Sequence, residues 1–187
     1  MMQTLKNLTI LNFMNHTLQE LLADKSIKTK EKVETISTWL LDGSLPSDEL
    51  LAFADGSKDA HNATCIEALE FATRQNPQVA DEEVLAYVTK TLTEKAPRIK
   101  WESAKVIGNM AHLFPTKLDT SIAHLLTNTE HEGTVVRWAA AFALGEILKL
   151  KTKHHRDLLP TLEAICLREQ NNGVKKKYLD AIKKTKK

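Results

Sequence analysis

The chain carries seven histidines, a side chain that binds metal ions and moves protons, among its 187 residues. They are His16, His61, His112, His124, His131, His154 and His155. A metal site on a helix typically uses two histidines four residues apart with an acidic third ligand, and no pair here has that arrangement. His154 and His155 are adjacent and precede Arg156, so we expect them to be solvated at the start of a helix. The sequence therefore predicts no metal centre.

The two cysteines, Cys65 and Cys166, lie about a hundred residues apart. Neither belongs to a Cys-x-x-Cys or Cys/His spacing, so a zinc site is not predicted. Both fall in apolar helical patterns, and we interpret them as small buried residues of a protein in the reducing cytoplasm. No Ser/His/Asp or Cys/His constellation and no glycine-rich phosphate loop can be assembled. We therefore assign no catalytic residue and no cofactor, and expect a protein that is not an enzyme.

Helical periodicity of the apolar residues runs through almost the whole chain, and no β-hairpin signal interrupts it. The segment 29–41 ends at Asp42-Gly43, a C-terminal cap signal. Ser47 follows Pro46 and precedes two acids, which predicts a helix start with Ser47 as its cap. The predicted helices cover residues 4–22, 29–41, 47–55, 58–74, 81–94, 98–113, 117–127, 134–150, 154–169 and 172–184.

These helices repeat in pairs. Residues 99–108, Ile-Lys-Trp-Glu-Ser-Ala-Lys-Val-Ile-Gly, align with residues 136–145, Val-Arg-Trp-Ala-Ala-Ala-Phe-Ala-Leu-Gly, at an offset of 37 residues. Residues 174–182 follow at an offset of 38, and residues 60–72 fit loosely at 38 or 39. A two-helix unit with a period just under 40 residues is typical of α-solenoids, because stacked pairs bury stripes that one pair cannot bury alone.

The pattern of residues 136–145, Val-Arg-x-x-Ala-Ala-x-Ala-Leu-Gly, resembles the second-helix signature of HEAT repeats, which are armadillo-like α-solenoids. Residues 99–108 are similar in a more degenerate form. The resemblance covers residues 81–187, about three repeats, whereas residues 1–75 share only the helical rhythm. It implies an all-α fold, a right-handed α–α superhelix of about five helix pairs that forms one domain over residues 1–187. Val136 and Leu144 are then expected to face the core.

The basic position of the HEAT pattern is occupied by Lys100 and Arg137. HEAT repeats usually place an Asp in the turn before the second helix, where it pairs with the basic residue. This chain departs from that pattern, because it offers Glu130 and Glu132 there and no Asp. We expect Lys100 and Arg137 to pair with turn acids or carbonyls of the neighbouring repeat, with ligand binding as the alternative.

Two tryptophans occupy a position that the HEAT pattern leaves variable, each one turn before another large or basic side chain. Because second helices line the concave surface of a solenoid, the resemblance implies an aromatic and basic ridge there. Its predicted members are Trp101, Lys105, Trp138, Phe142 and Lys176. Such side chains are typical of protein-binding surfaces and of nucleic-acid channels. The alternative is that the tryptophans wedge between adjacent repeats and are mostly buried.

Two enzymes with HEAT-like repeats offer further hypotheses. Deoxyhypusine hydroxylase binds two irons through several His-Glu pairs, but this chain has one such pair, His131-Glu132, in a predicted turn. The DNA alkylation-repair glycosylases use a basic, aromatic groove with a catalytic carboxylate, for which Glu102 and Glu146 are available. The paired tryptophan and aspartate helix of those glycosylases is missing here.

Charge is distributed unevenly, although the net charge is only +2. Residues 1–94 contain 8 Lys and Arg against 15 Asp and Glu, a net of −7, whereas residues 95–187 contain 18 against 9, a net of +9. Residues 175–187 alone hold seven lysines. This asymmetry indicates an anionic partner for the C-terminal half or association between opposite ends of two copies.

The favoured hypothesis is a non-enzymatic interaction module that binds a protein partner along its concave second-helix surface. The alternative is a nucleic-acid-binding protein of the alkylation-repair type that uses the basic C-terminal half. A homo-oligomer is a third expectation, because short solenoids expose their ends. No run of about 18 apolar residues is present, so no membrane span is predicted, and residues 1–22 lack the pattern of a signal peptide.

Overall fold

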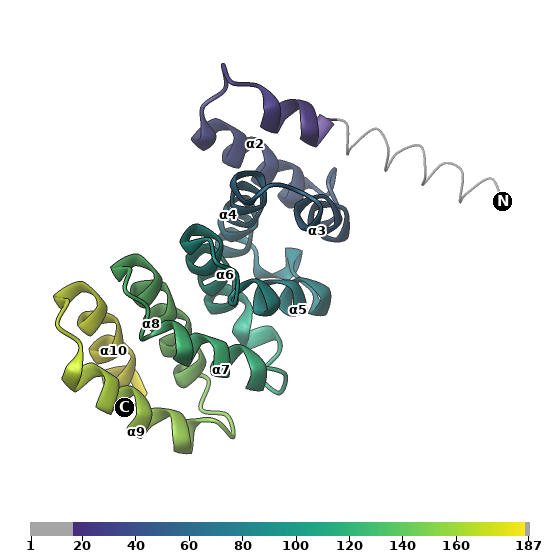
Figure 1. Cartoon of the computed structure of the whole chain (residues 1–187). Helices are drawn as coiled ribbons and strands as arrows, with labels where there is room; N and C mark the ends of the chain where they lie inside the picture. The colour runs from purple at the N-terminus through teal and green to yellow at the C-terminus, as the bar shows by residue number, and fades with distance from the viewer. Residues whose placement is uncertain (1–16, 186–187) are drawn as a thin grey trace. The chain divides into compact units, whose positions relative to one another are not determined.

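The computed structural model describes residues 17–185, and in that range the chain forms α-helices and short 3₁₀ turns without a strand. A helix at 17–23 precedes those labelled in Figure 1. The labelled helices are α2 (Thr29–Asp42), α3 (Ser47–Asp55), α4 (Asp59–Gln75), α5 (Glu82–Thr91), α6 (Pro97–Met110), α7 (Asp119–Asn128), α8 (Thr134–Lys149), α9 (His155–Arg168) and α10 (Asn172–Thr185). The 3₁₀ turns are η1 (Pro77–Val79) and η2 (Ala111–Leu113). These bounds confirm the predicted helices to within a few residues; the predicted segment 4–16 lies outside the described residues.

Local chemistry explains where several helices begin and end. Gly43 adopts a φ of 78° after α2, a left-handed conformation that favours glycine at a helix end. The Asp81 carboxylate accepts a hydrogen bond of 2.9 Å from the Val84 backbone N–H and so caps α5. The expected cap at Ser47 is wrong: Pro46 holds the cap position in an extended conformation, and Ser47 is already the first residue of α3.

The described residues divide into two compact units between Val79 and Ala80, called here the N-terminal unit (residues 17–79) and the C-terminal unit (residues 80–185). In the N-terminal unit, α2 and α3 both pack on α4. That all the repeats act as one domain stays a prediction.

In the C-terminal unit, α6, α8 and α10 lie side by side and form what we call the second-helix layer. Helices α5, α7 and α9 pair with them from the other side, so the unit holds three antiparallel pairs (Figure 1). The core between the layers is apolar. Val136 and Leu144, which were expected to face it, are at most 2% exposed, and so are Ala140 and Ile147 of the same helix.

Small residues bring the second helices close together. A Cβ added to Gly145 would lie 2.9 Å from the Ala181 Cβ, so α8 and α10 touch at this point. At the equivalent position one repeat earlier, a Cβ on Gly108 would lie 2.5 Å from the Phe142 ring. Gly108 and Gly145 both have negative φ angles, so the close approach of the helices, and not the backbone conformation, explains why glycine stands at these positions.

No helix among residues 17–185 has both the length and the apolar character needed to cross a membrane.

The buried face of α8 yields a stability prediction. Leu144 is 0% exposed, so we expect Leu144→Ala to lower the free energy of unfolding by about 2–5 kcal/mol, through lost burial and the cavity left behind. Chemical denaturation followed by circular dichroism measures this loss. The control is Leu167→Ala, because Leu167 is 80% exposed and its truncation should change stability by less than about 0.5 kcal/mol. Equal effects from the two variants would show that the assigned face of α8 is wrong.

Candidate functional site

The second-helix layer carries a stacked aromatic pair on α8. Trp138 and Phe142 lie one helical turn apart, both half-buried, with ring centroids 6.0 Å apart and planes inclined by 15°. The Lys177 ammonium of α10 lies 4.5 Å from the Trp138 ring centroid and 5.8 Å from that of Phe142. An ammonium over an aromatic face is attracted by the ring quadrupole. The structure therefore brings two predicted residues together and adds a lysine that the sequence analysis did not select.

Trp101 and Lys105, on α6, are joined by a shared carboxylate. The Trp101 Nε1–H donates to Oε1 of Glu102 at 2.7 Å, and the Lys105 ammonium donates to Oε2 at 2.8 Å. Glu102 is 4% exposed, and Trp101 and Lys105 are half-buried. The positive charge of Lys105 is therefore compensated within its own helix.

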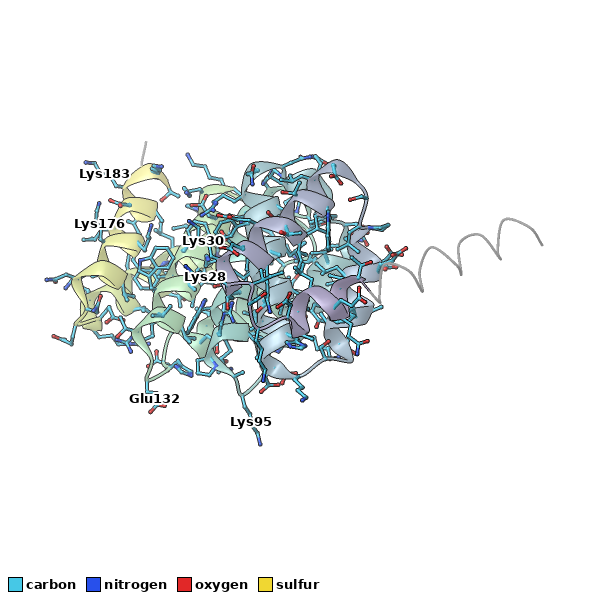
Figure 2. All side chains as sticks on the ribbon, turned by 90° about the horizontal axis from the view of Figure 1, so that it is seen from above. Lys28, Lys30, Lys95, Glu132, Lys176 and Lys183 are labelled. Atoms are coloured by element: carbon cyan, nitrogen blue, oxygen red, sulfur yellow. The ribbon has the colours of Figure 1, made fainter. Side chains whose placement is uncertain are left out.

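Lys176 does not lie with the aromatic pair. Its ammonium donates to the Asp180 carboxylate at 2.9 Å along the exposed face of α10, and its side chain is 72% exposed. Figure 2 shows Lys176 projecting outward from α10, as Lys183 does. The contact register explains the difference. Gly108 faces Phe142, and Gly145 faces Ala181 one repeat later. Ala181 is therefore the structural equivalent of Phe142, 39 residues after it. At that spacing the equivalent of Trp138 is Lys177.

A depression of about 140 Å³ opens between α8 and α10 next to the aromatic pair. Its apolar floor is formed by Phe142, Gly145 and Ala181, and its charged rim by Glu146, Lys149, Lys177, Asp180 and Lys184. Glu146 pairs with Lys149 on α8. Asp180 pairs with Lys176, which together with the other nearby lysines holds the pKa of Asp180 below its ordinary value.

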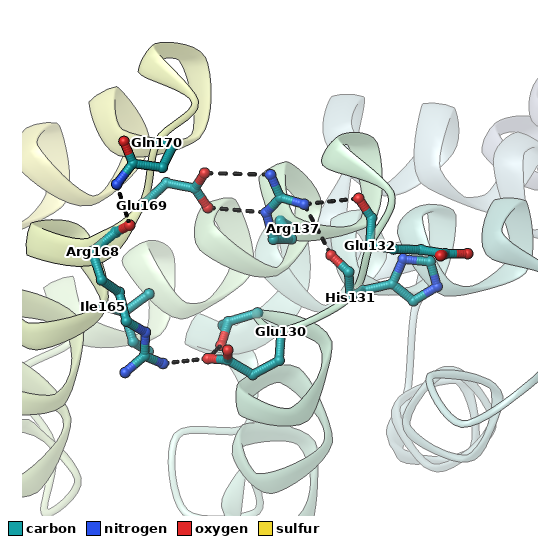
Figure 3. Close-up of a pocket in the computed structure, with 9 residues that line it drawn as sticks. Glu130, His131, Glu132, Arg137, Ile165, Arg168, Glu169 and Gln170 are labelled. Carbon is teal, nitrogen blue, oxygen red and sulfur yellow. Dashed lines mark hydrogen bonds and ion pairs between the residues drawn. The ribbon is translucent and has the colours of Figure 1, made fainter.

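The basic positions of the repeat serve the turn edge of the layer. Arg137 donates from Nε and Nη2 to both oxygens of Glu169, at 3.0 and 3.3 Å, and from Nη1 to the carbonyls of His131 and Glu132, each at 2.9 Å (Figure 3). Glu169 lies in the turn before α10, so Arg137 ties one helix pair to the next. The pairing between the basic residue and a turn acid is therefore present, but the acid is Glu169 instead of Glu130 or Glu132.

Lys100 repeats this arrangement one pair earlier. Its ammonium donates to the Leu92 carbonyl at 2.9 Å and to the Asn128 side chain at 3.3 Å. In the N-terminal unit, Lys32 donates to the Leu22 carbonyl at 2.7 Å. Each of these basic residues is the fourth residue of its helix and serves carbonyls at the end of the preceding helix or in its turn, which have no helical partner. The interpretation of Lys100 and Arg137 as structural residues is supported.

A cavity of about 350 Å³ lies along this edge, and both of its arginines are already paired with carboxylates. Besides the Arg137–Glu169 pair, Arg168 pairs with Glu130 across the cavity (Figure 3). His131, of the single His-Glu pair, accepts a hydrogen bond from the Gly133 N–H at 2.9 Å and shapes the turn. Within residues 17–185, no group of three or more His, Cys, Asp or Glu side chains is placed to hold one metal ion, and His16 lies outside that range.

The remaining candidates for chemistry have structural surroundings. Cys65 and Cys166 are buried free thiols, as expected, and burial raises the pKa of the Cys65 thiol to about 12. Glu102 and Glu146, the carboxylates considered for a glycosylase, are both engaged by lysines of their own helices.

The chain matches no protein-family model and no curated protein sequence. Among solved structures it is similar to a designed armadillo repeat protein, YIII(Dq)4CqI, with a TM-score of 0.68 and 17% identity, over 89% of this chain and 80% of that one. It is also similar to an engineered protein with a TM-score of 0.45 and 15% identity, over 92% of this chain and 96% of that one. The first similarity confirms the armadillo- and HEAT-like helical-repeat fold that the sequence predicts.

The Arg137–Glu169 pair yields a prediction about pH. Burial raises the pKa of Glu169, but the hydrogen bonds from Arg137 and from the Asn171 N–H outweigh it and hold the pKa below its ordinary value. A carboxyl with a depressed folded-state pKa stabilises the fold above its unfolded pKa of about 4.3, and this contribution is lost as the pH falls through the folded pKa. We expect Glu169→Gln to cost about 1.5–3 kcal/mol at pH 7, and this cost to shrink below pH 4.

Thermal unfolding of both proteins between about pH 3 and pH 7 measures this difference. The matched control is Glu130→Gln, because the Glu130–Arg168 pair is exposed on both sides and should contribute less than about 1 kcal/mol. A pH-independent effect of Glu169→Gln, or equal effects of the two variants, would contradict the assigned role of the Arg137–Glu169 pair.

Proposed function

We propose that this protein is a non-enzymatic interaction module that binds a segment of a protein partner along the second-helix layer of its C-terminal unit. Repeat folds of this kind act as protein-interaction scaffolds, and their second helices line the concave surface. The observation that supports the assignment most is the stacked Trp138–Phe142 pair beneath the Lys177 ammonium. Half-buried aromatic side chains next to a cation are typical of the centres of protein-binding surfaces.

The proposed surface extends along the layer through Trp101 and Lys105 on α6, with Lys176 at its outer margin. Its ring and carboxylate contacts hold these side chains in place before a partner arrives, since Glu102 joins Trp101 to Lys105 and Lys177 covers the aromatic pair. Fewer side chains then lose freedom on binding, which favours affinity.

A nucleic-acid partner has less support, because three lysines along the layer are each paired with a carboxylate of their own helix. Lys105 pairs with Glu102, Lys149 with Glu146, and Lys176 with Asp180. Binding to phosphate backbones depends on cations that can replace condensed counterions, and a lysine already paired with a carboxylate does so poorly. Nucleic-acid binding is therefore the alternative outcome of the experiments below, and the cytoplasmic location and self-association expected from the sequence stay predictions.

The proposal predicts where a partner can be captured in living cells. A photo-crosslinking amino acid at Asp180, which is exposed at the rim of the depression, should attach covalently to a discrete protein. The same amino acid at Ala123, which is exposed on α7 outside the second-helix layer, should not capture that protein. Trp138→Ala should reduce the capture at Asp180 while lowering the free energy of unfolding by less than about 2 kcal/mol, because Trp138 is only half-buried.

The matched variant for that experiment is Trp39→Ala, which removes a half-buried tryptophan from α2 in the N-terminal unit and should leave capture unchanged. Fluorescence anisotropy with labelled duplex DNA and single-stranded RNA, between about 50 and 200 mM salt, tests the alternative. Capture that is indifferent to Trp138→Ala, or micromolar nucleic-acid binding with a steep loss on added salt, would overturn the proposed function.

A further inference from the structure

We infer that the depression between α8 and α10 selects an acidic partner segment that inserts one apolar side chain between Lys177 and Lys184. This inference rests on the proposed function and deepens it, because it states the chemistry of the partner at one point of the second-helix layer. It is carried by the size of the depression, by its apolar floor, and by the excess of positive charge around it, where Lys176, Lys177 and Lys184 surround the single carboxylate of Asp180.

The volume restricts what can enter. Ligand pockets for small molecules usually measure about 300–1,000 Å³, whereas a cavity of about 150 Å³ accommodates a group the size of benzene. At about 140 Å³, the depression between α8 and α10 fits one large side chain and is too small for an organic ligand. An anchor residue of a polypeptide therefore matches it best.

The floor favours an apolar anchor. Gly145 and Ala181 are buried where the two helices touch and close the bottom of the depression, and the half-buried Phe142 ring forms one wall. Position 145 cannot carry a side chain that would fill the depression, because even a Cβ on Gly145 would meet the Ala181 Cβ at 2.9 Å. An aromatic or aliphatic side chain placed there would contact the Phe142 ring, and its apolar surface would be removed from water.

The rim favours acids next to that anchor. Of its five charged residues, Glu146 is paired with Lys149, and Asp180 is paired with Lys176. Lys177 and Lys184 form no ion pair among residues 17–185 and act on Asp180 only at longer range, while Lys176 holds that carboxylate. They lie two helical turns apart on α10, about 10 Å along its axis. An extended segment with acids on either side of its anchor can meet both ammonium groups.

Lys177 is held in position for such a contact. Its ammonium lies over the Trp138 and Phe142 rings, so one side faces the aromatic surface while hydrogen-bonding capacity remains for a carboxylate. Lysine side chains lose much rotamer freedom when they bind, and a cation already fixed over a ring loses less. Charge complementarity of this kind also suppresses wrongly charged partners.

The test uses three fluorescein-labelled synthetic peptides of equal length. One carries a single Phe flanked by glutamates, the second replaces that Phe by Ser, and the third keeps the Phe and replaces the glutamates by lysines. We expect the acidic peptide with Phe to bind most tightly, in fluorescence anisotropy, and the basic peptide not to bind. Lys177→Gln combined with Lys184→Gln should weaken the acidic peptide by about tenfold or more, since both partner charges are lost.

The matched control combines Lys175→Gln with Lys183→Gln, which removes the same charge from the same helix at positions that do not line the depression and leaves the Lys176–Asp180 pair intact. It should weaken binding by much less, and the Phe-to-Ser peptide should bind more weakly than the acidic Phe peptide to the unmodified protein. Equal losses from the two double variants, equal binding of the Phe and Ser peptides, or binding of the basic peptide would overturn the inference.

The crosslinking experiment separates this inference from the proposed function. If a protein is captured at Asp180 in a manner dependent on Trp138 while the acidic peptide fails to bind, the inference is wrong and the proposed function stands. If no protein is captured at Asp180 either, both are wrong.

Discussion

Direct contact between neighbouring second helices governs the arrangement of the C-terminal unit. A single helix pair has too little interior to bury its own apolar stripe, so each pair must pack against the next one. The contact is tightest where Gly145 meets Ala181 and where Gly108 meets the Phe142 ring. The absence of a side chain at Gly108 leaves room for the Phe142 ring at the contact between α6 and α8, and Trp138 and Phe142 both remain half-buried on the layer.

A second requirement arises at the turn edge, because the last carbonyls of each helix lack partners within that helix. Long basic side chains meet it from the first turn of the following helix, as Lys32, Lys100 and Arg137 show. The same side chains reach the next pair where an acceptor is available, Asn128 for Lys100 and Glu169 for Arg137. One residue type at one helical position therefore both satisfies a turn and links two repeats. Its presence at Lys32 shows that the N-terminal unit uses part of the same device, although its sequence retains little of the repeat signature.

The sequence predicted what depends on local order and missed what depends on contacts between helices. Helix positions and the buried face of α8 follow from a period of 3.6 residues, so Val136 and Leu144 could be assigned correctly. Lys176 was selected because the sequence alignment placed it 38 residues after Trp138, whereas the contact at Gly145 and Ala181 places Lys177 over the ring. Glu169 was missed because its partner, Arg137, lies on the preceding helix pair, and the sequence does not show which residues of two pairs come into contact. An alignment at 39 residues, which matches Ala181 with Phe142, would have indicated Lys177.

The net charge of +9 in residues 95–187 does not by itself describe a nucleic-acid surface. What a partner meets is the charge that remains after local pairing, and on the second-helix layer Glu102, Glu146 and Asp180 each neutralise one lysine. Each exposed pair adds little to stability, but it cancels a long-range field that would otherwise attract any polyanion. Among the cations left over, Lys177 is held in position above its rings. On the proposal made above, discrimination among partners depends on where an acid lies relative to an apolar anchor, which a rigid pair of helices can read and a diffuse basic surface cannot.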